Sequence, residues 1–67
     1  MSIRVTRPAM SELERHTTLG WVAPKNRPAA KECQLLGLLD FDGSKFKLTV
    51  RGLYVRNRTA SEVLVTD

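Results

Sequence analysis

The chain has little of what catalysis, redox chemistry or metal binding requires. Cys33 and His16 are the only thiol and the only imidazole in 67 residues. A lone cysteine cannot form an internal disulfide, and one residue of each kind does not supply the ligands of a tetrahedral metal site. A Gly-rich phosphate loop is also absent. The sequence therefore predicts a protein that is not an enzyme and has no catalytic residue, metal or cofactor, with Cys33 buried and His16 on the solvent side of a helix.

Long apolar segments are also missing. The longest apolar run, Leu35 to Leu39, is interrupted by Gly37 and is far shorter than the roughly 20 residues that cross a bilayer. The first ten residues lack the apolar stretch and small-residue cleavage pattern of a secretory signal. We therefore expect a cytoplasmic protein with no membrane association.

Aromatic residues make up only 6% of the chain. Trp21 continues a helical spacing that starts at Met10, so we expect it to be a core anchor rather than a platform for base stacking. Phe41, Phe46 and Tyr54 are expected to help build the core in the same way. With 67 residues and 42% apolar content, this core is small and belongs to a single domain.

Positive charge exceeds negative charge, with 11 Lys and Arg against 7 Asp and Glu. The excess is concentrated between residues 43 and 58, where no acid occurs and the basic residues are Lys45, Lys47, Arg51, Arg56 and Arg58. Such a segment favours binding to a polyanion or to an acidic protein. The plainer alternative is a basic face that only contacts solvent.

The first third of the chain predicts a strand and a helix. Ile3 and Val5 alternate with a polar residue, which is typical of a short edge strand. The spacing of Met10, Leu13, Thr17 and Trp21 then predicts a helix over about residues 10–21. Ser11 and Glu14 match a capping box at its start.

A second helix is predicted over about residues 28–36, after a polar turn. Pro28 suits the first helical position, and Gly37 suits the end of the helix. The helical spacing places two groups of residues on opposite sides. The inner side holds Ala29, Ala30, Cys33 and Leu36, and the outer side holds Lys31, Gln34 and Leu35.

A β-hairpin over residues 38–50 follows, because Asp42-Gly43 separates two short apolar runs. Its return strand alternates Phe46, Leu48 and Val50 with basic residues, so one face should be buried and the other basic. Thr49 then suits the N-cap of a third helix over about residues 50–57, with Leu53, Tyr54 and Val50 available for the core. The tail contains Val63, Leu64 and Val65, which can pair with the first residues as a strand or dock on another molecule.

The stretch CQLLGLLDFDGSKFKLTVRGLYV, residues 33–55, resembles the end of a winged helix-turn-helix domain. The resemblance implies an α+β fold, a small winged helix-turn-helix-like domain with two to three short helices and a β-hairpin wing. We expect a single domain over residues 1–67 with its core at about 10–57. Residues 1–8 and 59–67 would be edge strands or flexible tails.

This resemblance implies a small DNA-binding transcriptional regulator that uses helix 28–36 and the basic hairpin 38–50 on double-stranded DNA, as a homodimer if it reads sequence. The implied contacts are Lys25, Arg27, Lys31, Gln34, Lys45, Lys47 and Arg51. The alternative is a protein-binding modulator that docks on a larger partner, such as a component of the transcription machinery. Its contacts would be Leu35, Val63, Leu64 and Val65.

Overall fold

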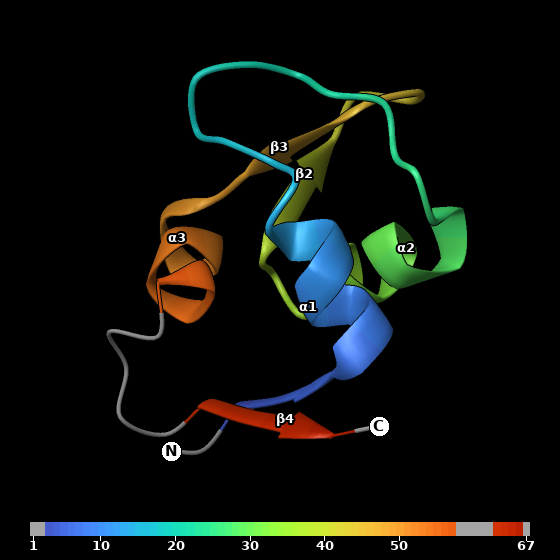
Figure 1. The fold of residues 1–67 in the computed structure, drawn as a ribbon. Coiled ribbons are helices and arrows are strands. Elements are labelled where there is room, and N and C mark those ends of the chain that lie inside the picture. Colours follow the sequence, from blue (N-terminus) through green and yellow to red (C-terminus); the bar gives the residue numbers. More distant parts are fainter. Residues whose placement is uncertain (1–2, 58–62, 67) are drawn as a thin grey trace.

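The protein is a mixed α+β structure with three helices and short strands (Figure 1). The computed structural model describes residues 3–57 and 63–66. Its elements follow in the order β1 (Ile3–Thr6), α1 (Arg7–Leu13), α2 (Arg27–Leu35), β2 (Leu39–Phe41), β3 (Phe46–Leu48), α3 (Val50–Arg56) and β4 (Val63–Thr66).

Helix α1 is shorter than predicted and begins earlier. Thr6 caps it, since its hydroxyl accepts a hydrogen bond from the amide of Ala9 at 3.3 Å, and Pro8 lies in its first turn. This N-terminus replaces the predicted capping box at Ser11, because a proline in the first turn loses no helical hydrogen bond and fixes a helical φ. The helix then ends at Leu13, so the prediction of a helix over residues 10–21 was wrong.

Pairing with the hairpin keeps residues 14–26 out of helix. The amide of Leu48 donates to the carbonyl of Thr17 at 2.8 Å, and Val22 forms an antiparallel bridge with Phe46. Trp21 lies on this extended segment and is 41% exposed. The prediction that it anchors the core was therefore wrong.

Helix α2 agrees with the prediction to within one residue. The side chain of Asn26 caps it by accepting from the amide of Ala29 at 3.2 Å, and Pro28 lies in the first turn. Gly37 follows its C-terminus with φ +78°, a left-handed conformation that glycine adopts without a steric penalty.

The hairpin and α3 also follow the sequence signals, although the strands are short. β2 and β3 pair antiparallel, and the intervening turn contains Gly43 at φ +112°. Thr49 caps α3 by accepting from the amide of Gly52 at 2.9 Å. Val50 begins α3 and is 67% exposed, and Tyr54 is also exposed. The prediction that these two residues enter the core was wrong.

The two ends of the described chain form a second sheet. β1 and β4 pair in parallel, with Ile3 opposite Val63 and Thr6 opposite Thr66, and they lie together below α1 in Figure 1. The predicted pairing of the tail with the first residues is confirmed for 63–66. Residues 59–62 and 67 of the predicted tail lie outside the described residues.

The core lies between α1, α2 and the hairpin, and small side chains bring the two helices together. Ala9, Ala30 and Cys33 are buried at the contact between α1 and α2, as predicted for Cys33. Burial raises the pKa of the Cys33 thiol to about 12, so it stays protonated at neutral pH. Gly52 lies so close to the Leu38 carbonyl oxygen that an added Cβ would overlap it.

Candidate nucleic-acid interface

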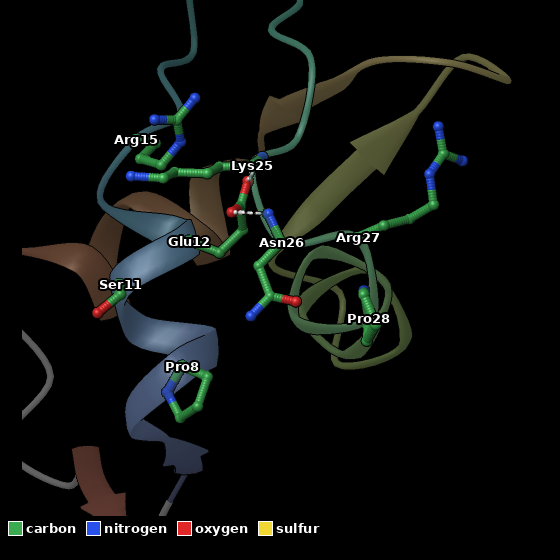
Figure 2. Close-up of a pocket in the computed structure, with 8 residues that line it drawn as sticks. All are labelled: Pro8, Ser11, Glu12, Arg15, Lys25, Asn26, Arg27 and Pro28. Carbon is green, nitrogen blue, oxygen red and sulfur yellow. Dashed lines mark hydrogen bonds between the residues drawn. The ribbon is translucent and has the colours of Figure 1, made fainter.

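A groove separates α1 from the start of α2, and most of its side chains are polar (Figure 2). Its volume is about 710 Å³. One side is formed by α1 and the residues just after it, namely Pro8, Ser11, Glu12 and Arg15. The other side is formed by the start of α2 and the residues just before it, namely Lys25, Asn26, Arg27 and Pro28. The segment 14–26 joins the two sides.

Glu12 lies at the inner side of this groove and is only 2% exposed. Its carboxylate accepts hydrogen bonds from the backbone amides of Asn26 at 2.9 Å and Lys25 at 3.3 Å, and it contacts Nε2 of His16 at 2.7 Å. Burial alone would raise the pKa of Glu12, but the hydrogen bonds from His16, Asn26 and Lys25 together lower it below its usual value. The carboxylate is therefore ionised at neutral pH.

His16 is fully buried, which contradicts the prediction that it faces solvent. Because an ionised carboxylate can only accept, Nε2 carries the proton in the hydrogen bond to Glu12. The His16 ring also lies edge-on to the Phe46 ring, with centroids 6.1 Å apart. The backbone carbonyl of His16 accepts a hydrogen bond from the Arg56 side chain at 2.9 Å. The i, i+4 spacing of Glu12 and His16 was the sequence signal for this pair.

The Glu12 carboxylate fixes the chain immediately before α2. It binds the amides of residues 25 and 26, while the Asn26 side chain binds the amide of Ala29. The amides of Asn26 and Ala29 at the start of α2 are thereby bound within the protein, and Pro28 has no amide hydrogen. The side chains of Lys25 and Arg27 remain exposed and carry the positive charge at this end of the helix.

Farther along α2, the predicted outer face is partly confirmed. Lys31 and Leu35 are exposed, and Gln34 is half-buried. The ammonium of Lys31 lies 5.3 Å from the ring centroid of Phe41. Leu35 is 81% exposed at the C-terminal end of the helix. The face is thus basic near its start and apolar near its end.

The hairpin is less basic than its sequence suggests, because the structure brings acids next to its lysines. Lys47 is half-buried, pairs in register with Asp40, and places its ammonium 4.9 Å from the ring centroid of Trp21. Lys45 is exposed beside the turn. There Asp42 accepts from the amides of Ser44 and Lys45, and these bonds hold its pKa below the usual value. Of the two lysines, only Lys45 is fully available to a ligand.

The remaining predicted residues lie apart from the groove, since none of them lines it. Arg51 is exposed on α3. On β4, Val63 and Val65 are half-buried against the core, whereas Leu64 is 48% exposed. Arg15 was not among the predicted contacts, because the packing of α1 against α2 places it on the groove.

Comparison with known protein families, with curated proteins and with solved structures found no match to this chain. Within residues 3–57 and 63–66, no helix has the length and apolar character to cross a membrane. The same residues contain no cluster of three or more His, Cys, Asp or Glu side chains suited to a metal ion. The charge, exposure and shape of the surface are therefore the observations that bear on function.

Proposed function

We propose that this protein is a small DNA-binding regulator of the winged helix-turn-helix type. The observation that carries the proposal is the exposure of all three cations in the first half of α2 and the residues just before it, namely Lys25, Arg27 and Lys31. Basic side chains around the start of an exposed helix supply both the phosphate contacts and the access to base edges that major-groove recognition needs.

The contacts divide by their distance from the start of α2. Lys25 and Arg27 are suited to backbone phosphates, and Lys31 and Gln34 to base edges. Exposed Lys45 on the hairpin and Arg51 on α3 would contact phosphates beside the helix. Lys47 would contribute less, since it is held between Trp21 and Asp40. Sequence-specific reading would need two copies on adjacent half-sites, because one short helix reaches few base pairs.

The test is fluorescence anisotropy with a mixed-sequence duplex over a series of salt concentrations. Arg27→Glu combined with Lys31→Glu should weaken binding by about 100-fold or more and reduce the salt dependence by at least the one phosphate contact assigned to Arg27. The control is Arg4→Glu, which changes an exposed residue of β1 that does not line the groove. Equal losses of duplex affinity in the double variant and in the Arg4→Glu control, or no duplex binding by the native protein at low salt, would exclude this function.

A protein-binding modulator is the second candidate, and the exposed end of α2 favours it. Leu35 and Leu36 are exposed there. The Thr49 hydroxyl donates a hydrogen bond to the Gly37 carbonyl at 2.8 Å, which brings the start of α3 close to this end of α2. Val50, the next residue, is also exposed. An apolar center with a charged rim is typical of a protein interface. Leu35→Asp should then abolish binding to purified transcription machinery while leaving duplex binding unchanged. The reverse result would contradict this candidate.

A further inference from the structure

The groove between α1 and α2 combines two cations that come from different segments of the chain. Arg15 lies just after α1, and Lys25 lies just before α2. Figure 2 shows the Lys25 side chain extending toward Arg15, while Arg27 extends to the other side. Neighbouring like charges repel each other, and an anion that contacts both relieves the repulsion.

The Glu12 carboxylate also lines the groove, and its negative charge offsets one of these two positive charges, so the net positive charge of the groove includes Arg27 at its edge. Glu12 is buried, and both of its oxygens are engaged by His16 and by the amides of residues 25 and 26. Those same bonds occupy backbone donors before α2, and the Asn26 side chain occupies the amide of Ala29. An incoming anion would therefore be held mainly by side chains.

We propose that this groove is a binding site for a phosphate group attached to a sugar, with Arg15 and Lys25 as its main ligands and Arg27 at its rim. A guanidinium offers a planar pair of donors and an ammonium adds a mobile charge, a combination that suits the several oxygens of a phosphate. The volume of about 710 Å³ is larger than a phosphate needs and lies within the range of about 300–1,000 Å³ for small-molecule sites.

The walls give the ligand an orientation. The rings of Pro8 and Pro28 provide apolar surface suited to a sugar. A second hollow of about 330 Å³ shares these prolines and Asn26, and it is also lined by Thr6 and Glu32. Glu32 would repel an anion at that end, and no Lys or Arg among the described residues lines the second hollow. At the other end Arg15, Lys25 and Arg27 outnumber Glu12. The phosphate thus belongs at the Arg15 and Lys25 end, with the sugar toward the prolines.

Two sources could present this chemistry, and they can be separated. A DNA strand would place one of its backbone phosphates in the groove, and in that case the inference rests on the proposed function. A free nucleotide would bind the same residues without any role for the outer face of α2. The experiment therefore uses adenosine monophosphate and a mixed-sequence duplex as separate probes of the full chain.

The measurement is a ¹⁵N NMR titration that follows the backbone amides of residues 11–15 and 25–27 and the side-chain Nε signal of Arg15. Adenosine monophosphate should shift these signals in the native protein. Arg15→Gln combined with Lys25→Gln should bind it about tenfold to 100-fold more weakly, the loss expected for charged hydrogen bonds. Arg4→Gln removes a positive charge from an exposed position outside the groove and should leave the affinity within about twofold.

The duplex arm separates this site from the proposed function. Groove shifts with adenosine monophosphate but no duplex binding would establish the phosphate site and exclude DNA as its source. Duplex binding that leaves the groove signals unchanged, together with no shift of these signals by adenosine monophosphate, would overturn the inference while the proposed function stands. Equal losses in the control variant, or equal binding of a polyglutamate peptide, would also overturn it by showing a general charge effect.

Discussion

Replacing Glu12 by glutamine removes the charge that holds the start of α2 while keeping nearly the same shape. The native carboxylate accepts from two backbone amides and from His16. A glutamine amide retains one acceptor oxygen, and its NH₂ group faces donors where the second oxygen was. Two of these bonds are exchanged or lost, and each buried donor left unsatisfied costs about 1–3 kcal/mol.

The hydrogen bonds from the amides of Lys25 and Asn26 are only partly buried, whereas His16 is fully buried. We therefore expect Glu12→Gln to lower the free energy of unfolding by about 2–3 kcal/mol. A chain of 67 residues has a total stability of roughly 3–10 kcal/mol. The loss would lower the Tm by about 8–24 °C, because each kcal/mol corresponds to about 4–8 °C in a domain of this size.

Urea unfolding followed by circular dichroism measures this effect, and Glu14→Gln is the matched control. Glu14 is exposed, so its variant should remain within about 0.5 kcal/mol of the native protein. Equal midpoints for the two variants would refute the argument that the Glu12 carboxylate fixes the connection. A changed slope with urea would indicate that the unfolded state had been altered instead.

The pH dependence gives an independent check with a defined sign. The folded pKa of Glu12 lies below its ordinary value of 4.5, so the folded protein favours the charged form. Its contribution is therefore fully present above pH 4.5 and is lost as the pH falls through the lowered folded pKa. The stability gap between native protein and Glu12→Gln should close on acidification. A gap that persists at low pH would contradict the assignment.

Three further predictions follow from packing. Gly52→Ala should destabilise the fold by about 2 kcal/mol or more in urea titrations, because its Cβ would overlap the Leu38 carbonyl; Gly20→Ala meets no atom within 4 Å and should leave the urea midpoint nearly unchanged. The Cys33 thiol, with a pKa of about 12, should resist iodoacetamide at pH 8 in the folded protein and react in urea; rapid labelling of the native state would contradict its burial. Trp21→Ala should cost less than about 2 kcal/mol rather than the roughly 3–5 kcal/mol of a buried aromatic residue, and a larger loss in the urea midpoint would contradict its exposed position.

The elements that were predictable are those that local chemistry specifies. Asn26 and Pro28 define the start of α2, and Gly37 defines its end. Asp42-Gly43 defines the turn of the hairpin, and Thr49 caps α3. Each signal acts over two or three residues and requires no knowledge of the tertiary contacts.

The segment after α1 could not be predicted in the same way, because distant residues decide its conformation. Thr17 and Val22 bond to residues of the hairpin, and this pairing overrides a spacing that also fits a helix. The position of His16 follows from the same pairing and from its bond to Glu12. Of the groove residues, Lys25 and Arg27 were predicted as contacts through the resemblance to winged helix-turn-helix domains, whereas Arg15 required the packing of the helices.

The buried carboxylate also determines what kind of binding site the start of α2 can be. A helix N-terminus with free amides binds anions through its backbone, so side-chain substitutions there have limited effect. Here Glu12 and Asn26 bind the amides of residues 25, 26 and 29, so the proposed phosphate site would rely mainly on Arg15, Lys25 and Arg27. The bonds that stabilise the fold would thus make affinity for the proposed ligand depend on exposed cations. Neutralising these cations should remove ligand binding without unfolding α2, whereas Glu12→Gln should weaken both ligand binding and the stability of the fold.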